Sequence, residues 1–560
     1  MLRLAPALAI IILLGPVVFG MAATLLPAFG YLPSLGGDSF TLSHFYKLWL
    51  TAGIGRSAVL SLASGLITTI FALGIVVLFV SGWHGTNVFA RMQHLISPLL
   101  SIPHAAAAFG LAFLIAPSGM IFRLLSPWAT GSTRPPDLLI LQDPLGLTMM
   151  LGLVLKEIPF LLLVTLAALP QTTANRSGHI AQSFGYGRIS GFLFVTWPLI
   201  YRQIRLAVFA VIAYATSVVD VAAILGPSTP STLAVRLTQW MGDPDLSLRF
   251  VASAGALLQL AVTVSAIAIW IAGEKIISKL MSRWRNKGAR FQAESALRLG
   301  GLSLIALTAS AVFAGLLILA LWSFAGFWAF PDALPRNFTL GNWQRALPTF
   351  VSPLNTTLLT GVAATLIAVI ITLACLEQEA RTGRTGGSRA LLFVYLPLII
   401  PQVSFVFGLQ LFFLNIGADA TWSALVFVHL IFVLPYVFLS LSDPWRAWDR
   451  RYALVAQGLG TSPNRVFWRV RLPMLLKPAL AATAVGFAVS IGQYLPTLLI
   501  GAGRWPTITT EAVALASGGD RRVIGVYAFL QMVLPFLGFA LATLIPALLF
   551  RNRKDMRAAS

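Results

Sequence analysis

The sequence predicts an all-α polytopic membrane protein of about twelve transmembrane helices, arranged as two homologous six-helix halves. Three observations support this fold class. Apolar residues make up 58% of the 560 residues, only 10% are charged, and the mean hydropathy is +0.84. Long apolar stretches recur along the chain, and one polar segment between them occurs twice. Such a composition is typical of membrane proteins and excludes an ordinary soluble domain.

The individual spans follow from length and hydropathy, because a helix needs about 20 mostly apolar residues to cross a bilayer. Six stretches in each half meet this requirement, and a polar stretch separates the two sets. We therefore predict a first half over 1–274, a basic cytoplasmic linker over 275–299 and a second half over 300–560. The predicted spans are 5–27, 55–80, 94–116, 145–168, 205–226, 250–273, 300–325, 354–376, 390–414, 421–441, 479–500 and 523–550.

The distribution of positive charge predicts the orientation, because Lys and Arg near span ends are retained in the cytoplasm. Placing both termini inside puts 27 of the 39 Lys and Arg residues in cytoplasmic segments. The net charge of +21 is therefore mainly a topology signal, and no nucleic-acid partner is expected. The first apolar stretch continues beyond signal-peptide length without a clear cleavage site, so we predict that it is a retained first helix.

A polar segment repeats at an offset of 275 residues. Residues 177–198 read SGHIAQSFGYGRISGFLFVTWP and residues 452–473 read YALVAQGLGTSPNRVFWRVRLP. Each copy predicts a short polar helix, a glycine break, a basic amphipathic helix and a proline, so equivalent hydrophilic hairpins project from the two halves. The identical pairs are Ala181/Ala456, Gln182/Gln457, Gly185/Gly460, Phe192/Phe467, Val195/Val470 and Pro198/Pro473.

The second copy shows the helix signals most clearly. Asp449 is placed to cap a helix over 450–459, and Gly460 suits the left-handed turn that ends it. Ser462 and Pro463 form a cap followed by proline at the first helical position. On the next helix apolar side chains alternate with basic ones. The apolar residues are Val466, Phe467 and Val470, and the basic ones are Arg465, Arg469 and Arg471.

The repeat admits two interpretations. A positively charged loop could serve membrane orientation alone, but orientation does not require a fixed spacing from glycine to proline. The hairpins resemble the cytoplasmic loop of ABC importer permeases, which carries E-A-A, three residues, G, and then L-P thirteen residues after that glycine. Gly185 to Pro198 and Gly460 to Pro473 both have this step. The resemblance covers the whole chain, as a fusion of two six-span permeases of the type I importer kind, similar to the thiamine and iron(III) transport permeases.

The resemblance implies roles for the hairpins. It places coupling loops at about 170–204 and 442–478, which would dock on two copies of an ATPase subunit. The positions that it assigns to coupling are His179, Ala181, Gly185, Phe192 and Pro198, with Leu454, Ala456, Gly460, Phe467 and Pro473.

The two copies depart from the family pattern and from each other. The family's leading Glu falls on His179 and Leu454. The first copy has Tyr186-Gly187-Arg188 where the second has Thr461-Ser462-Pro463, so the two docking sites are not expected to be equivalent.

The chain lacks the motifs of an enzyme. It contains no G-x-x-x-x-G-K-[ST] loop for nucleotide phosphates and no serine elbow, HExxH or spaced His/Cys cluster. We therefore expect no catalytic residue, no metal site and no cofactor in this chain, with ATP bound by a partner subunit. The lone Cys375 lies in an apolar span and is expected to be a small core residue.

Ionisable residues inside spans are costly and often functional. Lys156 and Glu157 lie side by side before Pro159, and Asp220 lies in the fifth span. Adjacent helical positions point about 100° apart, so each of Lys156 and Glu157 is expected to find a separate partner. Asp220 is either a pathway residue or a hydrogen-bond anchor between helices. Because the fifth span of each half lines the route in the family, the resemblance implies a translocation pathway formed by Asp220, Gln493, Tyr494, Lys156 and Glu157.

The function implied is the import of a small solute, delivered by a periplasmic binding protein, across the bacterial cytoplasmic (inner) membrane. A thiamine-like solute or iron(III) is favoured, and Asp220 is compatible with a cationic organic substrate. The alternative is an ion-gradient-driven secondary transporter of the major facilitator type, also built from six plus six spans. The loop at 377–390 is similar to that family's short basic loop, but the equivalent loop at 81–93 has nothing similar. That alternative gives no reason for two hairpins of fixed spacing.

Overall fold

The computed structural model describes residues 2–171, 180–288, 290–383 and 387–551. Most of these residues are helical, and the one small sheet among them pairs β1 (Tyr31–Leu32) with β2 (Gly37–Asp38). The helices up to the linker are η1 (Leu2–Leu4), α1 (Ala5–Ala28), η2 (Pro33–Leu35), α2 (Ser43–Leu50), α3 (Ile54–Trp83), α4 (Asn87–Ile96), η3 (Ser97–Ser101), α5 (His104–Ile115), α6 (Met120–Leu125), α7 (Leu147–Ala168), η4 (Leu169–Gln171), α9 (Arg188–Gly191), η5 (Phe192–Thr196), α10 (Trp197–Ser217), α11 (Asp220–Leu225), α12 (Leu233–Met241) and α13 (Leu248–Asn286).

The remaining helices belong to the second half. They are α14 (Ser295–Phe324), α15 (Gly341–Thr382), α16 (Ser388–Ile399), α17 (Gln402–Asn415), α18 (Trp422–Ala447), α19 (Arg451–Gly458), α20 (Pro463–Val466), η6 (Phe467–Arg471), α21 (Leu472–Met474), α22 (Leu476–Ile491), α23 (Leu495–Gly501), α24 (Ile508–Leu515) and α25 (Arg521–Leu549).

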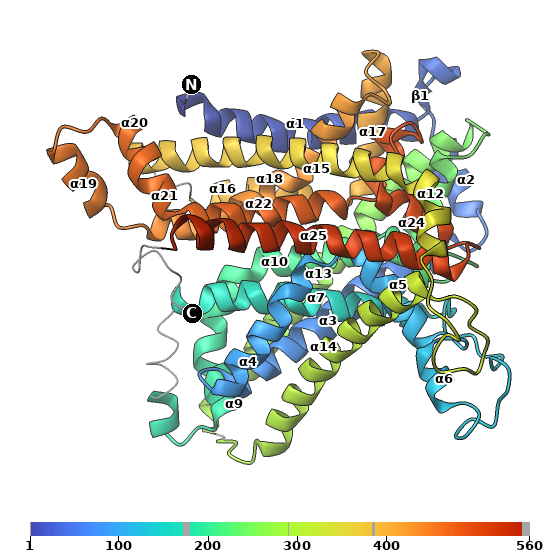
Figure 1. Ribbon diagram of the computed structural model, residues 1–560. Coiled ribbons are helices and arrows are strands. Elements are labelled where there is room, and N and C mark those ends of the chain that lie inside the picture. The colour runs from blue at the N-terminus through green and yellow to red at the C-terminus, as the bar shows by residue number, and fades with distance from the viewer. Residues whose placement is uncertain (1, 172–179, 289, 384–386, 552–560) are drawn as a thin grey trace.

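The expectation of about twelve membrane spans is confirmed. Within the described residues ten helices are long and apolar enough to cross a membrane, and two bent helix pairs raise the number to twelve. Figure 1 shows the long helices running between two ends of the molecule. The start of α1, the end of α25, α9 and α19 to α21 lie at one end, whereas β1, α6, α12 and α24 lie at the other. We call these the hairpin end and the opposite end.

The third and ninth spans are broken, which corrects the continuous helices expected over 94–116 and 390–414. In the third span α5 begins only after Pro103, and in the ninth α17 begins after Pro401, at 88° to the preceding helix. Proline pushes the residue before it out of the helical region. Ile102 and Ile400 are accordingly extended, with ψ of 126° and 127°.

The fifth and eleventh spans are also interrupted, which corrects the single helices expected over 205–226 and 479–500. The helix α10 ends at Ser217 and α11 starts at Asp220, while α22 ends at Ile491 and α23 starts at Leu495. A break in a helix inside a membrane domain is tolerated where protein surrounds it. The breaks therefore place free backbone groups and polar side chains in the interior.

The first helix of each half packs on the other half. The helix α1 packs against α17 and α16, and α14 packs equivalently against α5 and α3. Glycine permits both approaches. A Cβ on Gly408 of α17 would lie 1.9 Å from the carbonyl oxygen of Gly20 in α1, and a Cβ on Gly110 of α5 would lie 3.0 Å from the carbonyl carbon of Gly315 in α14. Small residues let membrane helices approach in this way. The largest hydrophobic core accordingly contains residues of both halves.

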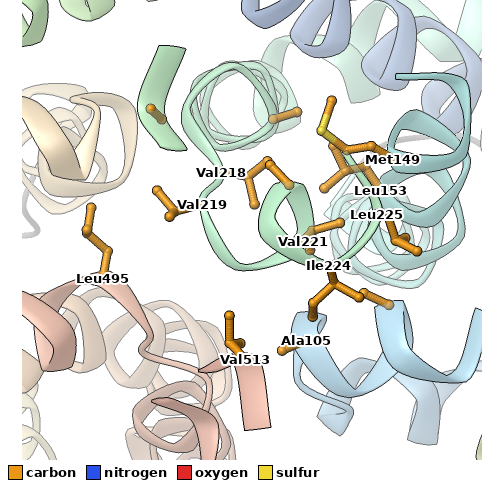
Figure 2. Close-up of a cluster of buried hydrophobic side chains, with 14 of the residues drawn as sticks. Ala105, Met149, Leu153, Val218, Val219, Val221, Ile224, Leu225, Leu495 and Val513 are labelled. Atoms are coloured by element: carbon orange, nitrogen blue, oxygen red, sulfur yellow. The ribbon is translucent and has the colours of Figure 1, made fainter. Parts of the chain in front are cut away.

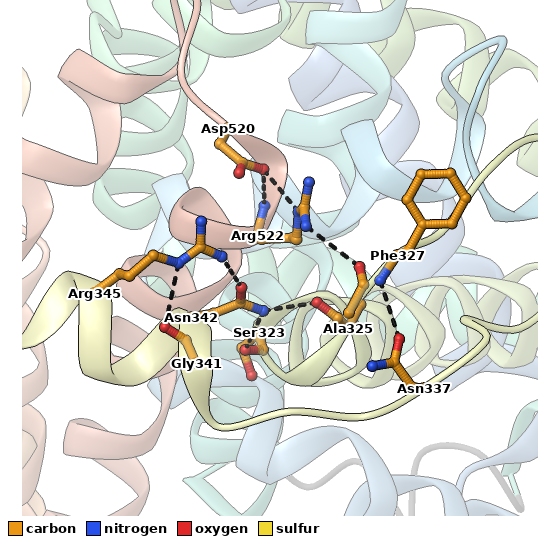
Figure 3. A network of polar contacts seen from close by, with 10 residues as sticks. Ser323, Ala325, Phe327, Asn337, Gly341, Asn342, Arg345, Asp520 and Arg522 are labelled. Carbon is orange, nitrogen blue, oxygen red and sulfur yellow. Dashed lines mark hydrogen bonds and ion pairs between the residues drawn. The ribbon is translucent and has the colours of Figure 1, made fainter.

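A polar network fastens the opposite end of the second half, as Figure 3 shows. The buried amide of Asn342, in the first turn of α15, donates to the carbonyl oxygens of Ser323 at 3.2 Å and Ala325 at 2.8 Å. Arg345 donates to the Asn342 Oδ1 at 2.6 Å, and Arg522 of α25 donates to the carbonyl oxygen of Gly326 at 3.4 Å. These bonds satisfy the carbonyl groups left free where α14 ends.

Candidate functional site

The second hairpin, residues 449–473, folds largely as its sequence predicts. An Asp449 carboxylate oxygen accepts from the backbone N–H of Arg451 at 2.9 Å, and the Arg451 side chain also bonds this carboxylate. These bonds lower the pKa of Asp449. The helix α19 follows and ends before Gly460, whose φ of +79° lies in the left-handed region. Pro463 opens α20 as predicted, but the Ser462 side chain makes no capping bond, so the expected side-chain cap there is wrong.

Both hairpins contain a π-helical turn at the same offset of 275 residues. These turns are η5 and η6, which begin at Phe192 and Phe467. Trp197 and Leu472 donate their N–H groups to the carbonyl oxygens five residues earlier, on Phe192 and Phe467. The next residue in each copy is a proline, which lacks an N–H and clashes with the carbonyl four residues before it. The wider turn accommodates this proline, which explains why Phe and Pro recur at a fixed spacing.

Arg471 does not lie on an exposed basic face, which corrects the amphipathic pattern expected for the second hairpin. Its guanidinium donates to Glu377 at 2.5 Å and lies 4.4 Å from the ring centre of Trp448. Only 9% of the Arg471 side chain and 6% of the Glu377 side chain are exposed. The reason is that α15 continues to Thr382 and carries Glu377 up to the hairpin.

The free surfaces of the two hairpins differ. In the second hairpin α19 has no buried residue, and large apolar side chains point outward. Leu459 is 81% exposed and Trp468 is 66% exposed. Tyr452, Leu454 and Val455 are also exposed, and Ala456 is half-buried.

The described part of the first hairpin, residues 180–198, exposes only Ile180, Phe184, Val195 and Pro198 among its apolar residues, whereas Ala181 and Phe192 are buried. Gly185 has a φ of +84°, as its match with Gly460 predicts. His179 lies outside the described residues. The backbone of Gly187 and of the first turn of α9 lies against the linker, which contributes the buried Glu294. Sequence reasoning missed Glu294 and Glu377, although each is an acid at the edge of a strongly basic segment.

Lys156 and Glu157 have separate partners, as expected from their positions on α7. The ammonium group of Lys156 donates to the carbonyl oxygens of Leu99 at 3.1 Å and Leu100 at 3.0 Å. Glu157 lies 3.3 Å from the imidazole Nε2 of His104, the first residue after the break in the third span. Lys156 therefore joins α7 to η3, while Glu157 joins α7 to α5.

Asp220 lies in the same polar region. The His104 ring packs on Tyr214, with ring centres 4.6 Å apart, and the Tyr214 hydroxyl donates to an Asp220 carboxylate oxygen at 3.5 Å. In the described residues neither Glu157 nor Asp220 forms an ion pair with a lysine or arginine. No group of three or more His, Cys, Asp or Glu among those residues is placed to hold a metal ion.

The second half contributes to this polar region at the helix break between α22 and α23. Gln493 and Tyr494 lie between α22 and α23, and Tyr494 is close enough to Asp220 to interact electrostatically. A Cβ on Gly492 would lie 3.9 Å from the Cβ of Pro103, so breaks of the two halves are neighbours.

Buried apolar side chains of both halves belong to one core cluster near these helix breaks, and Figure 2 labels Val219 and Val221 of the first half with Leu495 and Val513 of the second. The structure thus brings Glu157, Asp220 and Tyr494 into one largely buried cluster.

Comparison with known proteins identifies the family. No protein-family model matches the chain. The chain is 32% identical over 553 residues to the inner membrane ABC transporter permease protein YnjC of Escherichia coli (strain K12), covering 98% of this chain and 99% of that protein. It is 26% identical over 227 residues to a spermidine/putrescine transport system permease protein PotC homolog of Mycoplasma pneumoniae, covering 40% of this chain and 78% of that protein.

A third relative is the molybdenum transport system permease protein ModB of Mycobacterium tuberculosis. It is 29% identical over 181 residues, covering 29% of this chain and 68% of that protein. The two shorter permeases thus match less than half of this chain, whereas YnjC matches it from end to end. The chain therefore belongs to the family of ABC transporter inner-membrane permeases, multi-pass membrane proteins whose ATP is bound by a separate ATPase subunit.

Proposed function

We propose that this permease imports a small cationic solute, with a thiamine-like compound or iron(III) as the favoured candidates. A periplasmic binding protein delivers the solute to the opposite end. Two ATPase copies bound at the hairpin end drive its import, and the hairpin end faces the cytoplasm together with both termini. In this proposal residues 1–274 and 300–560 are the two permease halves, joined by the linker at 275–299. The excess of Lys and Arg in the segments of that end supports the orientation.

A secondary transporter of the major facilitator type no longer competes as an explanation of the twelve spans. The chain matches an ABC transporter permease along 98% of its length, and that match includes both hairpins. A transporter driven by an ion gradient also has no use for two hairpins of equal geometry at one end of the molecule.

The hairpins are proposed to receive the ATPase subunits. The observation that carries this role is their shared rigid geometry: a left-handed glycine turn, a π turn and a proline recur at an offset of 275 residues. The first hairpin continues directly into α10, whereas the second meets α22 through a 75° bend after α21. In both halves a displacement of the hairpin tip would therefore move the span behind it. The proposed coupling residues are His179, Ala181, Gly185, Phe192 and Pro198, with Leu454, Ala456, Gly460, Phe467 and Pro473.

The solute pathway is proposed to pass the polar cluster at the helix breaks of the fifth and eleventh spans. Glu157, Asp220, Gln493 and Tyr494 would line it, and Lys156 would support the wall through its bonds to η3. Two carboxylates without a Lys or Arg partner favour a positive charge, and the apolar surroundings strengthen that attraction. Aromatic rings such as that of Tyr214 add cation–π attraction for an organic cation. One relative is named for spermidine/putrescine transport and another for molybdenum transport, so the sign of charge rests on the two carboxylates.

The coupling role is tested with Gly460→Val in proteoliposomes that contain the permease with its ATPase subunits and binding protein. A β-branched residue cannot adopt the left-handed turn without strain, so we expect solute transported per ATP to fall while membrane insertion is unchanged. Gly458→Val is a matched control, because Gly458 lies two residues away in helical conformation with open space around its Cα. Normal coupling in Gly460→Val would count against the docking role.

The charge preference is tested with Glu157→Gln and Asp220→Asn in the same system. We expect uptake of the cationic solute to fall by about tenfold or more in each, since a hydrogen bond to a charged group contributes ~1.5–3 kcal/mol. Stimulation of the ATPase by the loaded binding protein should persist. Asp520→Asn, at the start of α25 and outside the cluster, is the control. Unchanged uptake in both cluster variants would remove them from the pathway.

A further inference from the structure

The linker runs back along the first hairpin and bonds its tip. The N–H of Gly187 donates to the carbonyl oxygen of Phe291 at 3.1 Å, and the Ser190 hydroxyl donates to the same oxygen at 3.1 Å. The Gln292 amide donates to the carbonyl oxygen of Gly185 at 3.1 Å. On the hairpin side two of these contacts use backbone groups and one uses the Ser190 hydroxyl, so they depend mainly on the hairpin's conformation.

Glu294 makes the strongest of these contacts. One carboxylate oxygen accepts from the N–H of Ile189 at 2.7 Å and the other from the N–H of Ser190 at 2.8 Å. Both N–H groups lie in the first turn of α9, where no preceding helical carbonyl is available to them. Glu294 is 5% exposed as a residue, and its negative charge also complements the helix dipole. Two charge-assisted bonds thus fix where the hairpin's second helix begins.

The fit leaves room only for glycine at the turn. A Cβ on Gly187 would lie 2.3 Å from the carbonyl oxygen of Phe291 and 2.5 Å from the Glu294 carboxyl group. This explains a difference between the repeats that the sequence alone left unexplained, because the second copy has Ser462 at the equivalent position. In the second hairpin no side chain caps α20.

Glu294 also belongs to the helix that follows. Its carbonyl oxygen accepts from the N–H of Arg298 at 2.9 Å, so its backbone begins α14 while its side chain begins α9. The helix α14 packs on α5 and α3 of the first half and on α25 of the second. One residue therefore connects the hairpin to the helix that lies between the two halves.

We propose that Glu294 is a positioning residue for coupling, which holds the first hairpin in register with α14. The linker is then part of the apparatus that transmits motion, and not only a connection between two permeases. A displacement of the first hairpin moves α14 with it, whereas the second hairpin acts on its own half through Glu377. This inference rests on the proposed docking role of the hairpins.

The test uses Glu294→Ala, Glu294→Gln and Gly187→Ala in the reconstituted transporter. Gly187→Ala breaks the same contact from the hairpin side without changing charge. We expect solute transported per ATP to fall severalfold in Glu294→Ala and Gly187→Ala, with Glu294→Gln between them and the wild type because its amide keeps one acceptor. Glu379→Gln, which loses an ion pair with Arg446 of α18 and touches neither linker nor first hairpin, should transport normally.

A distance measurement separates positioning from general stability. Spin labels on Phe184→Cys and Leu459→Cys, in a Cys375→Ala background, report the separation of the hairpin tips. We expect a broader distribution in Glu294→Ala and Gly187→Ala and an unchanged one in Glu379→Gln. An unchanged distribution and normal coupling in both variants, beside a loss in Gly460→Val, would overturn this inference alone. Normal coupling in Gly460→Val as well would overturn the docking role itself.

Discussion

The two hairpins share their backbone geometry and differ in what holds them. Each has a glycine with positive φ and a π turn seven residues later. The first is fixed by Glu294 of the linker through backbone N–H groups, and the second by Glu377 of α15 through the Arg471 side chain. The two copies thus share the hairpin's backbone conformation but not the contacts that anchor it. The comparison shows that local conformation is encoded within the repeat, whereas anchorage depends on residues outside it.

The largest effect is expected for Glu377→Ala, which removes the anchor of the second hairpin. Removing one partner of a buried ion pair leaves Arg471 buried without compensation, which costs about 3–5 kcal/mol. We expect a large drop in the thermal unfolding midpoint of the purified protein. The double variant Glu377→Leu with Arg471→Met should recover most of it, since the one guanidinium then left without Glu377 is that of Arg381, whose side chain is 28% exposed. A small effect of the single variant would show that Arg471 finds another partner.

Amide hydrogen exchange sharpens the comparison without any substitution. The N–H groups of Ile189 and Ser190 bond a buried carboxylate, whereas those of Asn464 and Arg465 in α20 receive no side-chain cap. A charged hydrogen bond of ~1.5–3 kcal/mol predicts about 10- to 100-fold slower exchange at the first pair. Glu294→Ala should make the two hairpins exchange alike. Equal rates in the wild type would contradict the stronger anchorage of the first hairpin.

Alanine at the turn glycines has a smaller expected effect. Left-handed backbone with a Cβ costs about 1–2 kcal/mol at either site. Gly460 has open space around it, but a Cβ on Gly185 would contact the Arg290 side chain at 3.4 Å. We therefore expect Gly185→Ala to lower the unfolding midpoint at least as much as Gly460→Ala, measured by scanning fluorimetry. If Gly460→Ala lowered the midpoint more, the Arg290 side chain would not add to the cost of a Cβ at Gly185.

Trp468→Ala should change stability least, within about 0.5 kcal/mol, because the side chain is 66% exposed. Its effect is expected instead on ATPase binding, measured as the dissociation constant of the ATPase subunit in nanodiscs. Phe184→Ala, which removes a 61% exposed side chain, is the comparison variant in the first hairpin, where fewer apolar side chains are exposed. Equal losses of affinity would argue that both docking surfaces contribute alike.

Hydropathy and the repeat predicted the span number and the hairpins, because both depend on local sequence. The breaks at Pro103 and Pro401 were visible as prolines, but a proline in a span does not reveal whether the helix kinks or ends. Arg471 was misplaced because its pattern on the helix suggested an exposed face, whereas its partner Glu377 lies 94 positions earlier in the chain. The close contacts of Gly110 with Gly315 and of Gly408 with Gly20 join helices that are distant in sequence, so no local pattern predicts them.

The polar cluster shows the same limit. Lys156, Glu157 and Asp220 were identified from charge alone, and their separate partners follow from helical geometry. The part played by His104 and Tyr214 could not be predicted, because histidine and tyrosine are common in spans. Only the folded chain brings the breaks of different spans together.

Because α1 and α14 each pack on the other half, the order in which the helices are synthesised matters for assembly in the membrane. The end of α1 at Ala28 and the start of its partner α17 at Gln402 are 402 − 28 = 374 positions apart. At about 5–20 residues per second, α1 waits roughly 20–75 s for that partner. The face of α1 around Gly20 is therefore without its α17 contact during this interval. In contrast, α14 emerges after α5 is already in place and can dock at once.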